Sequence, residues 1–287
     1  MADTLYMVTG ASGQLGRLVL AHLRTLVPED RILGLVRREA DAEELRAEGL
    51  GARIGDYEDA ESLEAAFERV GRLLLISGSA VGQRARQHRN VVDAAKASGV
   101  GFIAYTSILD AAHSGMALAA EHRLTEEMIR DAGIPHAFLR NGWYSENLLA
   151  SLENDLKLGK HLGAAGEGKF STAPRRDYAE AAAIVLSAEG HEGATYELAG
   201  DTAFTLTDLA KNIFAISGKN VIYVDMSEAD YKEALVEVGV PEAFAGILAD
   251  SDAWAAKGAL YSESKDLSTL IGHPTEPIEE TIRRALP

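Results

Sequence analysis

Short apolar runs alternate with segments of helical periodicity along the first half of the chain. The apolar runs predict strands at residues 4–8, 31–36, 52–54, 72–76, 101–106 and 136–139. Between them, apolar residues at helical spacing predict helices at 14–25, 41–48 and 118–132. The same spacing predicts a helix that begins at residue 59 and a separate, long helix that ends at residue 98. Residues 72–76 are almost wholly apolar, as in a strand covered on both faces. This alternation predicts an α/β fold with a Rossmann-type, doubly wound parallel sheet and right-handed crossovers.

The regular alternation of predicted strands and helices ends after Arg140. Residues 141–168 are irregular and rich in Gly, Asn and aromatic residues, and the pattern beyond them predicts mainly helices. We expect a dinucleotide-binding domain at 1–140, rejoined by 176–199, and a smaller substrate lobe formed by 141–175 and 200–287. Such a lobe would close over the carboxyl ends of the strands, where open α/β sheets bind ligands.

Three glycines follow the first predicted strand at G-x-x-G-x-x-G spacing: Gly10, Gly13 and Gly16. Glycine permits a tight turn and lets the backbone approach a pyrophosphate, which the N-terminus of the next helix attracts. An ordinary glycine-rich turn has the same residues, but the strand before it and the helix after it favour a dinucleotide site.

Composition narrows the possible partners. The formal net charge is −16, which disfavours binding to nucleic acids or anionic membranes. The chain has no cysteine, which excludes disulfides and thiolate chemistry, and its eight histidines lack metal-ligand spacing, so no metal is expected. We find no leader and no apolar run of membrane-spanning length, and therefore expect a cytoplasmic enzyme or binding protein.

The end of the second strand bears on the choice of cofactor. It reads Val36-Arg37-Arg38, and Arg37 lies 21 residues after Gly16, where an arginine favours the 2′-phosphate of NADP over the ribose hydroxyls of NAD. The alternative is a solvated arginine pair that begins a helix. We expect NADPH as the cofactor, with Arg37 on its 2′-phosphate.

Two further strand ends supply candidate cofactor contacts. Asp56 follows the third strand, where it either accepts from the adenine amine or serves as a turn acid. Ser77, Gly78 and Ser79 follow the fourth strand, where small residues let the backbone approach ribose and pyrophosphate; the alternative is a plain turn.

The chain lacks an obvious proton donor. Short-chain reductases usually carry Tyr-x-x-x-Lys on the helix after the fifth strand, but residues 119–125 contain no tyrosine, and Tyr261 to Lys265 is interpreted as coincidence. His122 is expected to be an exposed helix residue; the alternative is an acid at neutral pH. Hydride transfer to a ketone makes an alkoxide that needs an acid. Transfer to a quinone makes a phenolate, whose conjugate acid has a pKa of about 10, so water can protonate it. A site poor in donors therefore favours quinones.

An unusual segment, Asn141 to Asn147, follows the sixth strand. Trp143 and Tyr144 can stack on a flat ring, and Asn141 can hydrogen-bond a carboxamide or a developing oxyanion. The alternative is that the two aromatic residues only close the interface between the lobes. We name Asn141 and Tyr144 as the candidate catalytic residues, and add Thr172, at the end of a predicted strand at 169–172, to the cofactor contacts.

Several motifs together resemble a known family, the NmrA-like atypical short-chain dehydrogenase/reductases, and within it the bacterial type 2 NAD(P)H:quinone oxidoreductases. The resemblance extends over nearly the whole chain. The motifs that carry it are Gly10–Gly16, Val36-Arg37, Gly55–Tyr57, Leu74–Ser77, Gln87–Val91, Ile103–Ser107, Leu139–Asn147, Tyr196–Asp201 and Leu270–Thr275. Triphenylmethane dye reductases resemble the chain too, but differ after the fourth strand and around Trp143-Tyr144.

The resemblance implies flavin-free, NADPH-dependent reduction of a quinone or related acceptor, in a family that also lacks the Tyr-x-x-x-Lys pair. The cofactor contacts that it implies are Gly10, Ala11, Ser12, Gly13, Gln14, Leu15, Arg37, Asn141, Gly142, Trp143, Tyr144, Ser145 and Glu146. Two other functions stay open: a redox sensor that binds NADP(H) without catalysis, and a reductase of dyes or other xenobiotics. We expect a monomer or a homodimer.

Overall fold

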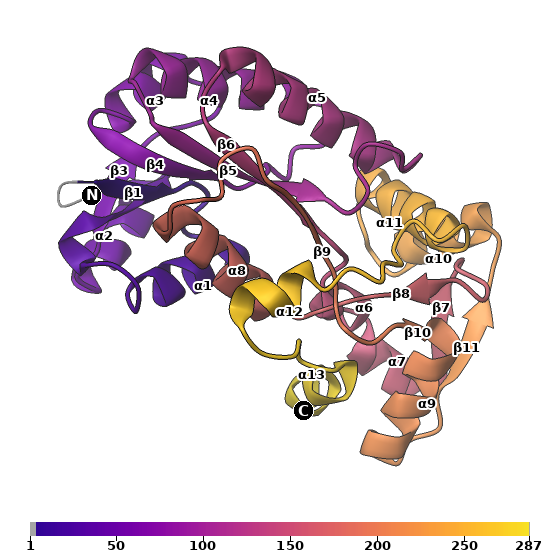
Figure 1. Ribbon diagram of the computed structural model, residues 1–287. Helices are drawn as coiled ribbons and strands as arrows, with labels where there is room; N and C mark the ends of the chain where they lie inside the picture. The colour runs from indigo at the N-terminus through magenta and orange to yellow at the C-terminus, as the bar shows by residue number, and fades with distance from the viewer. Residues whose placement is uncertain (1–3, 287) are drawn as a thin grey trace. The chain divides into compact units, whose positions relative to one another are not determined.

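The computed structural model describes residues 4–286, which form two compact units (Figure 1). The first unit comprises the described residues up to Ile108, together with Glu121–Arg140 and Arg175–Tyr196. The second comprises Leu109–Ala120, Asn141–Pro174 and the described residues from Glu197 onward. Each unit is therefore assembled from segments that are distant in sequence.

A seven-stranded sheet is the framework of the first unit. Its strand order is β3-β2-β1-β4-β5-β6-β9, and the pairs β1–β2, β1–β4, β2–β3 and β4–β5 are parallel. The strands are β1 (Leu5–Val8), β2 (Ile32–Val36), β3 (Gly51–Ile54), β4 (Val70–Leu75), β5 (Phe102–Ile108), β6 (His136–Asn141) and β9 (Thr195–Leu198). The order reverses direction between β1 and β4, which confirms the Rossmann-type α/β fold predicted from the sequence.

Helices cover both faces of this sheet. Figure 1 shows α3, α4 and α5 along one face, and α1, α2 and α8 along the other. Their bounds are α1 (Gln14–Leu23), α2 (Glu39–Ala47), α3 (Ala60–Ala66), α4 (Arg84–Ala97), α5 (Ala117–Ala132) and α8 (Arg175–Ser187), with the short 3₁₀ helix η1 (Glu29–Arg31) before β2. Asp59 caps α3 by accepting the N–H groups of Glu61 and Ser62, as its position predicts. A buried core that includes Met7, Leu73 and Val91 lies between the sheet and helices α3, α4 and α5.

The second unit contains two small sheets and several helices. Strand β7 (Lys160–Gly163) pairs in parallel with β11 (Ile222–Asp225), and β8 (Lys169–Phe170) pairs antiparallel with β10 (Phe204–Thr205). The helices are α6 (Ser145–Leu148), α7 (Leu152–Leu158), α9 (Leu206–Ser217), α10 (Glu228–Glu237), α11 (Glu242–Ala255), α12 (Asp266–Ile271) and α13 (Ile278–Ala285). In the described part of the chain, no helix is both long and apolar enough to cross a membrane.

Candidate functional site

The turn after β1 has the geometry that its glycines predict. Gly10 has a φ of +58°, which side chains disfavour, and its carbonyl oxygen accepts the N–H of Gly13 (2.9 Å). A Cβ at Gly16 would lie 2.3 Å from that same carbonyl oxygen, so α1 can begin this close to the turn only with glycine there. The three glycines thus bring the first turn of α1 against the end of β1.

The N-terminus of α1 lacks a side-chain cap. Its N-cap residue, Gly13, offers no side chain, and its first turn contains no acidic residue. In contrast, α9 begins with a capping box in which Thr205 and Asp208 bond each other's backbone N–H groups. The N–H groups at the start of α1, and the positive end of its dipole, are therefore suited to an external anion.

A cavity of about 300 Å³ lies against this turn. Its walls come from the carboxyl ends of β1, β2, β3 and β4 and from α4. The residues of the sequence prediction that line it are Gly10, Ser12, Gly13, Arg37, Asp56, Ser77, Gly78 and Ser79. Ala11, Gln14 and Leu15 are not in its walls, and the side chains of Ala11 and Leu15 are buried. The backbone N–H of Ala11 already donates to the carbonyl oxygen of Leu35 (3.2 Å), so Ala11 shapes the turn, whereas Leu15 can reach a ligand only through its backbone N–H.

The two arginines after β2 differ in their environment. Arg38 is held by Asp41 through two hydrogen bonds (3.0 and 2.6 Å), which lower the pKa of Asp41 and raise that of Arg38. Arg37 is exposed at the cavity wall and forms no ion pair within the described residues. Of this pair, Arg37 is thus the cation that remains available to a phosphate.

Asp56 and Tyr57 form the wall that follows β3. One carboxylate oxygen of Asp56 accepts the N–H of Glu58 (3.0 Å), so Asp56 does act as a turn acid while it also lines the cavity. The hydroxyl oxygen of Tyr57 lies 2.5 Å from Thr9 Oγ1 and 2.9 Å from the carbonyl oxygen of Ile76. Burial raises the pKa of Tyr57, so it stays protonated at neutral pH and ties β1, β3 and β4 together.

In the second unit, Asn141 and Tyr144 are bonded to each other. The amide nitrogen of Asn141 donates to the Tyr144 hydroxyl oxygen (3.1 Å). Asn141 is only 5% exposed, and its Oδ1 is buried without a hydrogen-bond partner among the described residues. An orphaned buried acceptor is costly, so Oδ1 is suited to a donor from water or from a ligand.

The neighbours of this pair are largely fixed by the unit's own contacts. The N–H of Gly142 donates to the carbonyl oxygen of Leu198 (2.7 Å). The hydroxyl groups of Ser145 and Thr172 lie 2.9 Å apart, and both residues are buried. Trp143, Tyr144 and Glu146 are half-buried. The aromatic side chains are thus partly open to a ligand, whereas the hydroxyls of Ser145 and Thr172 are bonded to each other.

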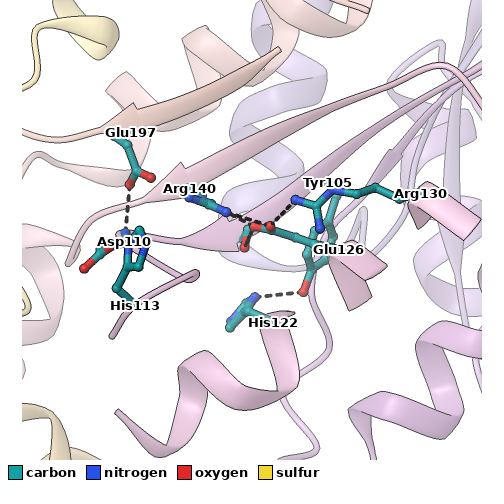
Figure 2. A network of polar contacts seen from close by, with 9 residues as sticks. Tyr105, Asp110, His113, His122, Glu126, Arg130, Arg140 and Glu197 are labelled. Carbon is teal, nitrogen blue, oxygen red and sulfur yellow. Dashed lines mark hydrogen bonds and ion pairs between the residues drawn. The ribbon is translucent and has the colours of Figure 1, made fainter. Parts of the chain in front are cut away.

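His122 is not the exposed helix residue that the sequence analysis expected. It is 5% exposed, and its Nδ1 lies 2.7 Å from the hydroxyl of the buried Tyr105 (Figure 2). The expectation is wrong because His122 shares the buried face of α5 with Thr125, Glu126 and Ile129. Burial, with the charge of Arg84, lowers its pKa well below the ordinary value, which argues against an acid role at neutral pH.

Sequence reasoning also missed a buried charge network in the first unit. Glu126 receives two hydrogen bonds from Arg140 (2.9 and 2.8 Å) and one from Arg130 (3.0 Å) (Figure 2). The hydroxyl of Ser107 donates one more (2.7 Å). Burial opposes ionisation of Glu126, but Arg140, Ser107 and Arg130 together lower its pKa. The signal was present in the helical spacing of His122, Thr125, Glu126 and Ile129, which predicts one shared face.

Comparison with known proteins identifies the family of this chain. The model of the NmrA-like family matches residues 2–282. The chain belongs to the NmrA-like family. The resemblance inferred from the motifs is therefore confirmed, and it covers segments of both units.

Proteins at least 40% identical to this NmrA-like chain include a relative and two solved structures. Quinone oxidoreductase 2 of Escherichia coli is 54% identical over 275 residues, which cover 96% of each chain. A crystal structure of an E. coli NADPH-dependent quinone oxidoreductase complexed with NADPH matches with a TM-score of 0.95, 53% identity, and 98% and 99% of the two chains. The triphenylmethane reductase of Citrobacter sp., complexed with NADP(H), matches with a TM-score of 0.94, 40% identity, and 98% and 100% of the chains.

Proposed function

We propose that this chain is an NADPH-dependent oxidoreductase that transfers a hydride to a quinone. The observation that carries the proposal is the unpaired Arg37 at the wall of a cavity that the glycine turn also lines. The relationship to quinone oxidoreductase 2 supports it over nearly the whole chain.

The residues of the first unit fit the adenosine and pyrophosphate parts of NADPH. The uncapped start of α1 binds the pyrophosphate through the backbone N–H groups of Ser12, Gln14 and Leu15. Gly10, Ala11 and Gly13 hold the turn against the ligand, because the N–H groups of Ala11 and Gly13 are bonded to Leu35 and Gly10. Arg37 binds the 2′-phosphate, and Asp56 faces the adenine. Ser77, Gly78 and Ser79 approach the ribose and the pyrophosphate from the end of β4.

The residues after β6 fit the nicotinamide end. Asn141 is the last residue of β6, which follows β4 and β5 in the sheet order, and its orphaned Oδ1 matches the N–H of a carboxamide. Trp143 and Tyr144 offer aromatic surface to a flat ring. Gly142, Ser145, Glu146 and Thr172 complete this group of proposed contacts, with Ser145 and Thr172 supporting the shape of the segment.

The chemistry that the chain must support is modest. NADPH, when bound, supplies the hydride. Asn141 holds the carboxamide through Oδ1 and the hydroxyl of Tyr144 through Nδ2. Tyr144 orients the acceptor and stabilises charge on its oxygen, and the remaining contacts hold the reactants in place. A reduced quinone is a phenolate whose conjugate acid has a pKa of about 10, so water can supply its proton. The low pKa of buried His122 and the raised pKa of Tyr105 are consistent with a site that has no side-chain acid.

One assay tests the proposal. NADPH oxidation is followed with benzoquinone, with a triphenylmethane dye, and with no added acceptor. We expect rapid oxidation with benzoquinone and little without an acceptor. Turnover of the dye alone would make the chain a dye reductase, and tight NADPH binding without turnover on either acceptor would make it a sensor.

We further propose that the enzyme acts in the cytoplasm, as a monomer or a homodimer. The absence of cysteine and the acidic surface support a soluble protein that does not need an oxidising compartment. Light scattering coupled to size-exclusion chromatography measures its mass, and a trimer or larger species would contradict the proposal.

A further inference from the structure

His88 on α4 is held in a single tautomer. Its Nε2 accepts the backbone N–H of Gly78 (3.0 Å), so that nitrogen cannot carry the proton. Nδ1 therefore carries it and donates to Thr125 Oγ1 (2.9 Å), which itself donates to the carbonyl oxygen of Glu121 (2.9 Å). His88 is fully buried, and burial, together with the charge of Arg84, lowers its pKa to about 3. The ring is thus a neutral, permanently oriented acceptor.

Other residues of α4 bind the same two loops of the cavity wall. Arg84 Nε donates to the carbonyl oxygen of Gly78 (2.5 Å), so both backbone polar groups of Gly78 are bound by α4. Asn90 Nδ2 donates to the carbonyl oxygen of Tyr57 (2.8 Å), in the loop after β3. A Cβ at Gly78 would lie 3.2 Å from Gln87 Oε1, so this loop lies directly against the helix. Gly78 and Tyr57 both line the cavity.

We propose that His88 and Asn90 are positioning residues for the cofactor. His88 fixes the position of the loop after β4 through Gly78, and Asn90 fixes the position of the loop after β3 through Tyr57. This rests on the proposed function in so far as NADPH is the ligand. It assigns a role to two residues of the motif Gln87–Val91, which the sequence linked only to the family resemblance. The two residues act through backbone groups of the loops and do not touch the ligand.

The sheet order separates the two roles. The loop after β3 lies at one edge of the sheet, whereas β4 lies on the other side of β1. A dinucleotide binds across the point where the strand order reverses, so its two halves face different loops. The Asn90 contact thus positions the loop that binds the adenine half of NADPH, and the His88 contact positions the loop that binds the half leading to the nicotinamide.

Calorimetric binding of two ligands tests this division. NADPH spans both loops, and adenosine 2′,5′-bisphosphate contains only the adenosine half. We expect His88→Leu to raise the Kd for NADPH about 5- to 20-fold, the effect of losing one buried hydrogen bond and the loop order that depends on it. The same variant should change the Kd for adenosine 2′,5′-bisphosphate less than about twofold. Asn90→Asp, which cannot donate to Tyr57, should weaken both ligands by a similar factor.

Two further variants separate positioning from folding. His88→Gln offers an amide oxygen to the N–H of Gly78 and should restore most of the NADPH affinity. Val92→Ala removes buried volume from the same helix without touching the cavity loops, so it should lower thermal stability and leave both Kd values unchanged. Unchanged NADPH binding in His88→Leu would overturn the proposal. An equal loss of binding in Val92→Ala would also overturn it, because stability alone would then explain the effect.

The ring itself supplies a readout that does not depend on affinity. Nitrogen-15 NMR of His88 should show a protonated Nδ1 and an unprotonated Nε2 from about pH 5 to pH 8. The opposite tautomer, or a charged ring, would contradict the proposed acceptor role. The binding and NMR results stand even if the chain reduces no quinone, so failure of the proposed function and failure of this inference are distinguishable.

Discussion

At the scale of single residues, neighbours with the same side chain have different roles. Arg37 and Arg38 are adjacent, yet Asp41 binds Arg38 and leaves Arg37 at the cavity. Sequence spacing placed an arginine at the end of β2, and the structure adds the reason why Arg37 is the available one. In contrast, the buried contacts of His88 and His122 could not be predicted, because each depends on a partner from another element.

The two arginines give a matched pair of variants. Arg37→Ala should raise the KM for NADPH about 10- to 100-fold, because charge-assisted hydrogen bonds to a phosphate contribute about 1.5–3 kcal/mol. The KM for NADH should hardly change, since NADH lacks the 2′-phosphate. Arg38→Ala serves as the control: it removes the ion pair between the exposed Arg38 and the buried Asp41, and should leave the ratio of the two KM values near that of the wild type. An unchanged KM for NADPH in Arg37→Ala would show that another residue binds the 2′-phosphate.

At the scale of elements, apolar patterning predicted the long strands and helices well and the short ones poorly. The six predicted strands of the first half correspond to β1–β6. The apolar runs of five of them are buried between helix layers, whereas β3 is an edge strand without a buried residue. Within the irregular segment 141–168 the apolar pattern predicts one helix near residues 147–158, but the structure has two helices there, α6 and α7. Strand β7 was missed, since its buried His161 is bonded to Asp155 and the strand lacks an apolar run. Helix α12 has six residues, too few for a periodic pattern.

The buried network of Glu126 joins three of these elements, since Ser107 lies on β5, Glu126 on α5 and Arg140 on β6. Glu126→Gln should destabilise the protein by about 3–5 kcal/mol, because it leaves Arg140 buried without its carboxylate. Urea unfolding followed by far-ultraviolet circular dichroism measures the loss. Arg130→Ala is the control: Arg130 bonds the same carboxylate but is half-exposed, so its loss should cost about 1 kcal/mol or less. Equal losses in the two variants would contradict the dominant role of the buried pair.

At the scale of the whole molecule, both units belong to the family, and the family model matches residues 2–282. Residue patterns identified the nucleotide-binding half by its glycine turn and strand ends, which have direct physical meanings. The second unit offered no comparable motif apart from the segment after Arg140. Its interior contacts, such as those of the buried Asp252, involve residues that are remote in sequence and carry no local pattern.

Asp252 makes the stability of the second unit depend on pH. Burial raises its pKa to about 6; the N–H of Ala164 and the nearby His161 oppose this, and Asp225 adds to it. The folded state therefore binds this proton more tightly than the unfolded chain, whose aspartates have a pKa of about 3.9. The resulting stability is present below about pH 4 and is lost as the pH rises to 6 and above.

Asp252→Asn should remove this loss, because the amide stays neutral while its oxygen can still accept the N–H of Ala164. We expect the variant to be more stable than the wild type by about 1–3 kcal/mol at pH 8, and by about half as much at pH 5. Both tryptophans, Trp143 and Trp254, lie in the second unit, so urea unfolding followed by tryptophan fluorescence reports on this unit. Glu237→Gln, at an exposed position on α10, is the control and should show no such difference between the two pH values. If the Asp252→Asn variant gained the same stability at both pH values, the cause would be a change in packing or local charge that is independent of the proton.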